Sequence, residues 1–217
     1  MNKMEELLKN VNVEWKRLGE IGSFYGGLQG KSKYDFNEGN AKFVPYKNVY
    51  LNPSLNLSLL ESVKIYDGEK QRTLERGDVI FTLSSETLEE CGLSSVVTEQ
   101  TTQNIYLNSF CFYLRLHNKH ILLPDFSKYL FRSKNLRKQI IKTAQGVTRF
   151  NVSKKLMKNI IIPIPPLEVQ KEIVGILDMF STLTVELARS ISKEITLRQK
   201  QYEYYREKLL MFDKSHS

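Results

Sequence analysis

The hydrophobic positions change their spacing at a cluster of three prolines, Pro163, Pro165 and Pro166. Before the cluster, residues 41–51 (AKFVPYKNVYL) and 104–116 (NIYLNSFCFYLRL) are rich in β-branched and aromatic side chains, which is typical of strands. After it, apolar residues recur at intervals of three and four, which is typical of a helix. The pattern therefore predicts two parts of different architecture.

The segments before the prolines predict a mixture of strands and helices. Residues 75–83 (ERGDVIFTL) predict a turn followed by a strand, and residues 126–146 have the apolar spacing of a helix that ends at Gly146. Ser153 is a candidate N-cap for a further short helix. Because strands and helices do not alternate regularly, we expect one α+β domain over residues 1–162.

The chain after the prolines predicts one long helix, over residues 163–217. Proline is well tolerated at a helix start, and after Pro166 the only residue that would weaken a helix interior is Gly175. About 45 residues at 1.5 Å each give a helix of roughly 68 Å, longer than the expected diameter of the domain. Part of this helix is therefore expected to pack against a partner helix.

The apolar spacing along this helix defines a seam with steps of three and four and one additional step of four. Two seam positions, Thr184 and Arg198, are polar and are candidates for setting the register of pairing. The predicted interface positions are Ile173, Leu177, Phe180, Thr184, Leu187, Ile191, Ile195, Arg198, Tyr202, Tyr205, Leu209 and Phe212.

The net charge of +8 belongs to the first part of the chain. Residues 1–160 carry 24 basic and 16 acidic residues, whereas residues 161–217 carry 8 of each. Residues 128–158 hold ten basic residues and no acidic one. Such a surface attracts polyanions, and the absence of carboxylates over 31 residues favours a nucleic-acid-binding face over an ordinary solvated lysine-rich face.

The sequence offers no catalytic or metal-binding constellation. Gly30-Lys31-Ser32 ends like a phosphate-binding loop, but Tyr25 stands where that motif needs glycine. The two cysteines and the histidines lack the paired spacing of zinc ligands. We therefore expect a non-catalytic protein that binds neither metal nor cofactor.

The termini and the two cysteines indicate a compartment. No stretch of about 18 apolar residues is present, and the first 15 residues lack the apolar core of a signal peptide. Cys91 and Cys111 are expected to be reduced and half-buried, and Trp15 is expected in the core. These features predict a cytoplasmic protein without a membrane span.

Three segments resemble one family. They are residues 14–27 (EWKRLGEIGSFYGG), residues 144–178, which contain the junction IPIPPLEVQ, and residues 198–212 (RQKQYEYYREKLLMF). They are similar to the start, the end and the following helix of a target-recognition domain in specificity subunits of type I restriction–modification systems. Residues 31–115 match only loosely, as expected of a segment that varies with the DNA target.

The resemblance implies a DNA-reading subunit without catalysis. Such subunits read a split sequence in double-stranded DNA and recruit a methyltransferase subunit, which uses S-adenosylmethionine, and in some complexes a nuclease-translocase subunit. The family usually carries two recognition domains and two long helices, whereas this chain has one of each. It resembles a half-subunit: a natural short product, a truncated one or a fragment.

Two copies are therefore expected to pair as a homodimer through an antiparallel coiled coil, which would place the domains at opposite ends. The expected target is bipartite and palindromic, with a span of at most about 20 base pairs. Pairing with a different specificity subunit stays open. The alternative function is a coiled-coil assembly protein with a basic patch that binds nucleic acid without sequence preference.

The candidate DNA contacts fall into two groups. Arg149, in the loop GVTRFNVS, is either a phosphate contact or a brace between the domain and the helix base, and both remain open. The phosphate candidates of the basic window are Arg132, Lys134, Arg137, Lys142, Arg149, Lys154 and Lys155. The candidates for base readout, in loops with amide, hydroxyl or basic tips, are Gln29, Lys31, Lys33, Lys47, Asn48, Ser84, Ser85 and Thr87.

Overall fold

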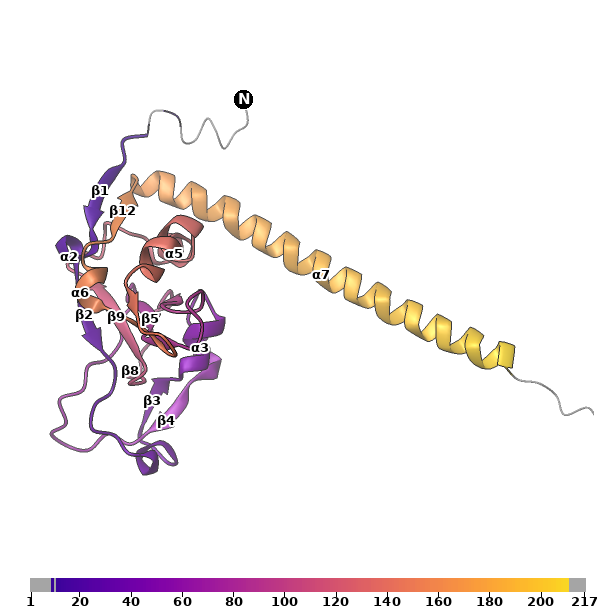
Figure 1. Cartoon of the computed structure of the whole chain (residues 1–217), viewed down its shortest axis with the longest axis horizontal. Coiled ribbons are helices and arrows are strands. Elements are labelled where there is room, and N and C mark those ends of the chain that lie inside the picture. The colour runs from indigo at the N-terminus through magenta and orange to yellow at the C-terminus, as the bar shows by residue number, and fades with distance from the viewer. Residues whose placement is uncertain (1–8, 10, 211–217) are drawn as a thin grey trace, which may run out of the picture. The chain divides into compact units, whose positions relative to one another are not determined.

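The computed structural model describes residue 9 and residues 11–210 (Figure 1). The chain divides into two compact units, Met1–Val174 and Gly175–Ser217. The first is a mixed α+β domain and the second is the greater part of one long helix, which confirms the fold class predicted from the sequence. None of the described helices is long and apolar enough to cross a membrane.

The centre of the domain is a four-stranded antiparallel sheet of order β2-β9-β5-β7. Alternate side chains of a strand point to opposite faces, so Phe81 of β5 packs on one side with Phe112 while Ile80 packs on the other with Tyr113. Both faces are therefore covered. The strands are β2 (Gly22–Gly26), β5 (Val79–Thr82), β7 (Ser94–Val96) and β9 (Cys111–Leu116).

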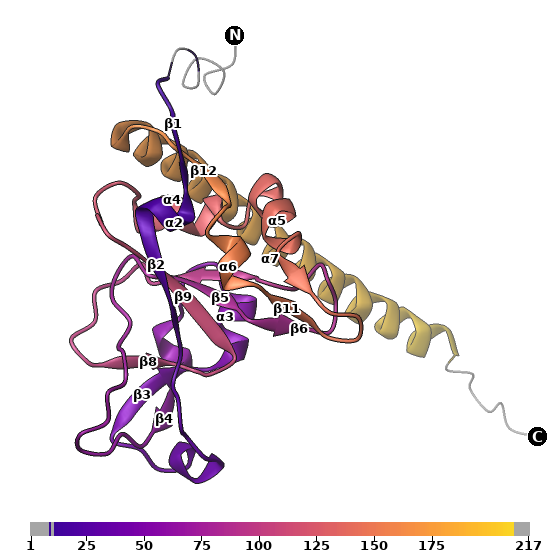
Figure 2. The same ribbon diagram turned by 60° about the vertical axis from the view of Figure 1, so that its left-hand side comes forward.

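Three small sheets surround the central one (Figure 2). The first pairs β1 (Glu14–Arg17) with β12 (Ile161–Ile164), and the second has the order β4-β3-β8. In the third, the hairpin of β10 and β11 pairs through β11 with β6, which lies far away in the sequence. The remaining bounds are β3 (Ala41–Val44), β4 (Glu61–Val63), β6 (Ser84–Ser85), β8 (Ile105–Leu107), β10 (Ala144–Gln145) and β11 (Phe150–Val152).

Short helices cover the sheets. Capping by Ser153 is confirmed, because its Oγ accepts a hydrogen bond from the backbone N–H of Leu156 at 3.4 Å. The described helices of the domain are α2 (Leu18–Ile21), α3 (Tyr46–Leu51), α4 (Pro124–Leu130), α5 (Lys134–Ile141) and α6 (Lys154–Met157), with the 3₁₀ turns η1 (Lys33–Phe36) and η2 (Leu57–Leu59).

The predicted single helix over residues 126–146 is wrong in two respects. It is divided into α4 and α5, because Ser133 is extended and caps the second helix. Gly146 is not a helix cap but lies in the β10–β11 hairpin with φ of 130°. A Cβ atom at that position would lie 2.1 Å from the Arg149 carbonyl oxygen, so the hairpin requires glycine there.

Residues 41–51 contain a strand followed by a helix rather than one strand. β3 ends at Val44, and Pro45 is extended and precedes the first residue of α3, Tyr46. The location of Trp15 is a second correction, because its side chain is 66% exposed on β1 while Ile162 and Ile164 of the paired strand face the core.

The helix α7 (Leu167–Leu210) begins directly after the prolines, as predicted. Its first two turns belong to the domain unit, because Ile173 and Val174 pack against the core and Gln170 is fully buried. The boundary between the two compact units therefore lies within α7, after its first eight residues. The sequence predicts a boundary between residues 162 and 163 instead.

Candidate nucleic-acid interface

A cavity of about 370 Å³ lies where three segments distant in sequence meet. α3 contributes Tyr46 and Tyr50, β6 contributes Ser84 and Ser85, and the β10–β11 hairpin contributes Arg149. The meeting follows from the sheet register, because β11 pairs antiparallel with β6. This cavity joins a predicted phosphate contact to two predicted base readers and is the candidate DNA-contacting site.

Hydrogen bonds fix the cavity walls. The Tyr46 hydroxyl donates to the Ser84 carbonyl oxygen at 3.0 Å, and the rings of Tyr46 and Tyr50 lie 6.2 Å apart at an interplanar angle of 23°. The Arg149 Nε donates to the Ser84 Oγ at 3.3 Å while the residue remains exposed. A guanidinium with further free donors therefore borders the cavity.

Glu90 supplies a carboxylate to the same cavity. It accepts hydrogen bonds from the Tyr50 hydroxyl, from the Thr87 Oγ1 at 2.9 Å and from the Ser85 Oγ at 3.3 Å. The hydrogen bond from Tyr50, followed by that from Thr87, lowers the pKa of Glu90, so the group is an anion at neutral pH. The cavity thus contains the held Glu90 carboxylate, the exposed carboxylate of Glu86 and one arginine.

Sequence reasoning missed Tyr46, Tyr50, Glu90 and Phe110, which also lines the cavity and is 59% exposed. The only signal for the tyrosines is their spacing of four residues, which places them on one helix face, but the pattern of residues 41–51 predicts a strand. Glu90 was missed because Tyr50, which donates to it, and Arg149, which shares the cavity with it, lie in distant segments of the chain.

Two predicted base readers have structural roles instead. The side chain of Lys31 is only 4% exposed, and its ammonium lies 2.5 Å from the Glu69 Oε1. Asn48 is 1% exposed: its Nδ2 donates to the Asn56 carbonyl at 2.8 Å and its Oδ1 accepts from the Asn56 N–H at 3.1 Å. These interactions occupy both side chains, so neither remains a candidate for base readout.

The other predicted base readers are divided between the cavity and separate surfaces. Ser84 and Ser85 line the cavity, and Thr87 adjoins it through Glu90. Gln29, Lys33 and Lys47 are exposed and lie outside its lining.

Two arginines of the basic window, which the sequence predicts as phosphate contacts, brace the fold from within. Arg132 donates to the carbonyl oxygens of Ser94, Val49 and Tyr50 at 2.7–3.1 Å. Arg137 donates to those of Gly92, Cys91 and Glu89 at 2.5–2.8 Å. Burial lowers the pKa of both guanidinium groups. The remaining members, Lys134, Lys142, Arg149, Lys154 and Lys155, are exposed.

Replacing Arg137 with alanine is expected to lower the free energy of unfolding by about 2–4 kcal/mol, because three backbone carbonyls lose a charged donor. The measurement is chemical denaturation, with Lys138→Ala as the control because the neighbouring lysine is exposed. Loss of DNA affinity without loss of stability in Arg137→Ala would contradict the bracing role.

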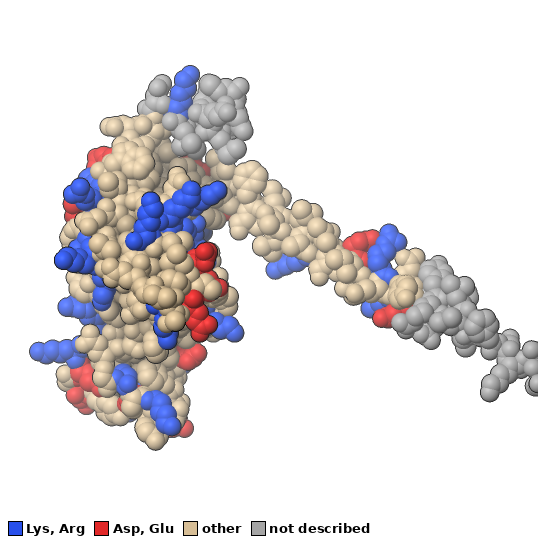
Figure 3. All heavy atoms as spheres, in the orientation of Figure 1, with Lys and Arg blue, Asp and Glu red and all other residues tan. Residues whose placement is uncertain are grey.

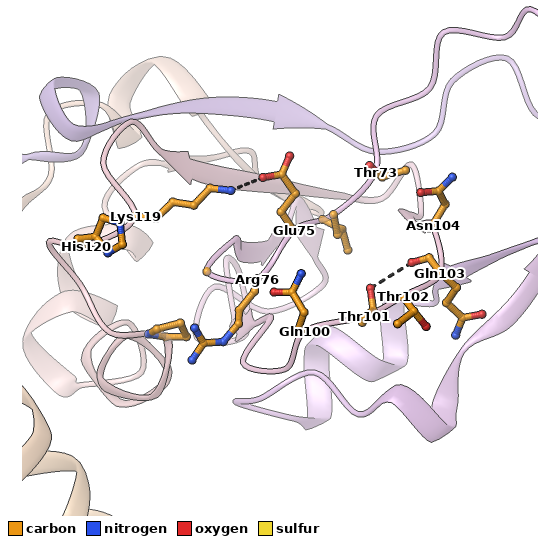
Figure 4. Close-up of a pocket in the computed structure, with 13 residues that line it drawn as sticks. Thr73, Glu75, Arg76, Gln100, Thr101, Thr102, Gln103, Asn104, Lys119 and His120 are labelled. Carbon is orange, nitrogen blue, oxygen red and sulfur yellow. Dashed lines mark hydrogen bonds and ion pairs between the residues drawn. The ribbon is translucent and has the colours of Figure 1, made fainter.

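Lys and Arg side chains are spread over the visible face of the domain, and a separate group of acidic side chains lies at its right-hand edge (Figure 3). A second cavity, of about 500 Å³, contains Glu75, Lys119 and a loop of amides and hydroxyls over residues 100–104 (Figure 4). Its Lys119 ammonium is paired with Glu75, which also accepts from Arg115 at 2.7 Å. Lys119 and Glu75 are thus held by ion pairs, and the exposed Arg76 also lines the cavity, which offers a polar surface with a cationic side chain.

The described residues contain no group of three His, Cys, Asp or Glu side chains placed to hold a metal ion. Cys91 and Cys111 are both free, and they are more deeply buried than the sequence predicts. Burial raises the pKa of the Cys111 thiol to about 12, so this group is not a nucleophile at neutral pH.

The second unit exposes an apolar stripe along α7. Phe180, Leu187, Ile191, Ile195 and Tyr202 of the predicted seam are all at least half exposed. Ile173 and Leu177 are partly buried, Tyr205 and Leu209 lie in the helix, and Phe212 lies outside the described residues.

The two polar members of the seam make hydrogen bonds within the helix. The Thr184 Oγ1 donates to the Phe180 carbonyl oxygen at 2.8 Å, and the Arg198 Nε donates to the Glu194 carboxylate at 3.0 Å. Neither polar group therefore requires a partner, whereas the apolar members remain open to solvent in this unit.

Comparisons with known proteins agree on one family. The profile described as the type I restriction modification DNA specificity domain matches residues 10–197. The chain is 31% identical to the EcoR124I/EcoR124II specificity subunit of Escherichia coli, covering 95% of this chain and 50% of that protein. It is also 31% identical to a putative type I specificity subunit of Haemophilus influenzae, covering 97% and 49%. The chain thus spans about half the length of these curated relatives.

Solved structures share the fold. The S subunit of a type I restriction–modification system from M. genitalium aligns with a TM-score of 0.54 at 17% identity, covering 95% of this chain and 48% of that one. The HsdS subunit from Thermoanaerobacter tengcongensis aligns with a TM-score of 0.56 at 21% identity, covering 84% and 42%. At these identities the likeness establishes the architecture alone.

Proposed function

Because the chain belongs to the type I restriction modification DNA specificity family, we propose that it recognises a specific sequence in double-stranded DNA for a methyltransferase subunit. The methyltransferase supplies the chemistry and binds S-adenosylmethionine, and a restriction subunit is a further partner. The single observation that carries this proposal is the cavity, which brings Arg149, Ser84 and Ser85 together from separate parts of the chain.

Positioning and reading are assigned to different residues. Exposed cations of the basic window, foremost Arg149 at the cavity and Lys154, hold phosphates, since such contacts fix the register of a protein on the duplex. Polar groups of the cavity then contact base edges, which carry the sequence information.

Two copies are proposed to pair through α7. The apolar stripe of Leu187 and its seam neighbours supports this pairing, because exposed apolar side chains at heptad spacing gain free energy when a second helix covers them. An antiparallel pair has a two-fold axis across the helices and would present two domains to two half-sites. The 44 residues of α7 span about 66 Å, which limits the target to about 20 base pairs.

The assembly is tested by the solution mass of the purified chain, alone and mixed with a type I methyltransferase subunit, in multi-angle light scattering. We expect a dimer of the 25.3 kDa chain that gains mass when the methyltransferase is added. A monomer that ignores the methyltransferase would favour the alternative of a helical assembly protein.

Replacing Arg149 with alanine is expected to weaken binding to duplexes of any sequence. Loss of one phosphate contact lowers the slope of log affinity against log salt by about 0.9. The measurement is fluorescence anisotropy at several salt concentrations. Arg76→Ala is the control, because this exposed arginine lines the second cavity instead.

The outcomes of this comparison separate three roles for Arg149. A loss for all sequences supports the phosphate contact, and a loss confined to one sequence would make the residue a base reader. Unchanged affinity with reduced stability would make it a brace within the domain.

A further inference from the structure

We propose that Glu90 is a specificity-determining residue that accepts a hydrogen bond from the N4 amino group of a cytosine in the recognised half-site. The inference rests on the proposed function and extends it to one base and one side chain. Its starting observation is an ionised carboxylate in the wall of a cavity that also contains an exposed arginine and an exposed phenylalanine.

The carboxylate is held in place before any ligand arrives. Tyr50 donates to its Oε1, and Thr87 and Ser85 donate to its Oε2. An ionised carboxylate has about four lone-pair sites, so three donors leave acceptor capacity for another partner. A side chain fixed by three hydroxyls loses little conformational freedom when it binds.

The charge of Glu90 decides which chemical group it can contact. A carboxylate repels phosphates, so Glu90 has no role in binding the DNA backbone, which falls to Arg149 at the border of the same cavity. In the major groove the amino groups of cytosine and adenine are the donors of the base edges. Glu90 is therefore suited to reading an amino group.

Cytosine is favoured over adenine because of the group that lies beside the amino group on each base edge. Adenine presents the N7 acceptor beside its N6 amino group, and an acceptor-only carboxylate is repelled by N7. Cytosine presents the N4 amino group beside an apolar C5–H edge. The exposed Phe110 ring in the same cavity offers an apolar surface for that edge.

The simpler interpretation is that Glu90 only braces the loop between β6 and β7. A brace of this kind needs the hydroxyl donors but no open cavity and no remaining acceptor. Glu90→Gln separates the two roles, because the amide keeps one oxygen for Tyr50 while its NH₂ group is a donor that repels an amino group.

The test is selection of bound duplexes from a randomised library by the purified full chain and by its Glu90→Gln variant, followed by sequencing. We expect the wild-type motif to contain an invariant cytosine. The variant is expected to lose that preference by about 5- to 150-fold at this position and to keep the others. Glu89→Gln is the matched control, since Glu89 is an exposed neighbour outside the cavity lining.

A probe on the DNA makes the test independent of folding. Replacing that cytosine with pyrimidin-2-one, which lacks the amino group, is expected to weaken wild-type binding by a similar factor. The Glu90→Gln variant is expected to bind the two duplexes equally. Together these results give a double-mutant cycle across the contact.

Each other outcome overturns a defined part of the account. A Glu90→Gln motif identical to the wild-type motif, or a loss spread over all positions while the melting temperature is unchanged, would overturn the role of Glu90 alone. If the wild-type chain enriches no sequence, the proposed function fails and the inference fails with it.

Discussion

We expect the double substitution Leu187→Glu, Ile191→Glu to convert the proposed dimer into a monomer. Both side chains are exposed in the single helix and lie one turn apart on the seam. Full burial of each contributes about 1.5–3 kcal/mol, and a carboxylate there is desolvated without a partner. Light scattering should report a fall from twice the chain mass to 25.3 kDa.

The control for this experiment carries the same added charge on another face of the helix. Ala188→Glu with Ser192→Glu moves both carboxylates by about 100° around α7 while keeping their spacing. We expect this variant to remain dimeric. An unchanged mass for the seam variant would show that α7 does not pair through Leu187 and Ile191.

The second large effect is expected from Gln170→Leu. The Gln170 side chain is fully buried: its Oε1 accepts from the Leu123 N–H at 2.8 Å, and its Nε2 donates to the carbonyls of Ile121 at 2.9 Å and Pro165 at 2.8 Å. Leucine leaves these three backbone groups without this partner. The free energy of unfolding should fall by about 2–4 kcal/mol.

This fall corresponds to a decrease in melting temperature of roughly 5–15 °C for a unit of this size. Gln139→Leu is the matched control, because the half-buried Gln139 makes two similar bonds to the backbone of the exposed Ile161. Its substitution should cost less than about 1 kcal/mol. Equal melting of the two variants would mean that Gln170 does not secure the start of α7 to the domain.

The long helix could be predicted because its signals are local. Pro165 and Pro166 permit a helix start, and the following apolar spacing continues without another proline. The same local reasoning identified Ser153 as a helix cap, but it missed Ser133, whose extended backbone divides one apparent helix into two.

Side-chain roles were harder to predict because composition does not tell which way a residue points. Arg132 and Arg137 count toward the basic window, but both guanidinium groups point to backbone carbonyls inside the fold. Asn48 has the polarity of a base reader and is instead the buried partner of Asn56.

The cavity itself could not be predicted, since its parts are joined only by tertiary structure. Arg149 and Ser84 are 65 residues apart and meet because β11 pairs with β6. Tyr50 and Glu90 are 40 residues apart, and their hydrogen bond depends on how α3 packs near β6. Such pairings are absent from local patterns of polarity.

The most direct measurement of the central claim is the sequence that the purified wild-type chain enriches from a library of random duplexes. The account predicts two identical half-sites in inverted orientation, separated by a fixed spacer and together no longer than about 20 base pairs. Retention of duplexes without any enriched sequence would contradict it and would leave a helical assembly protein with a basic surface.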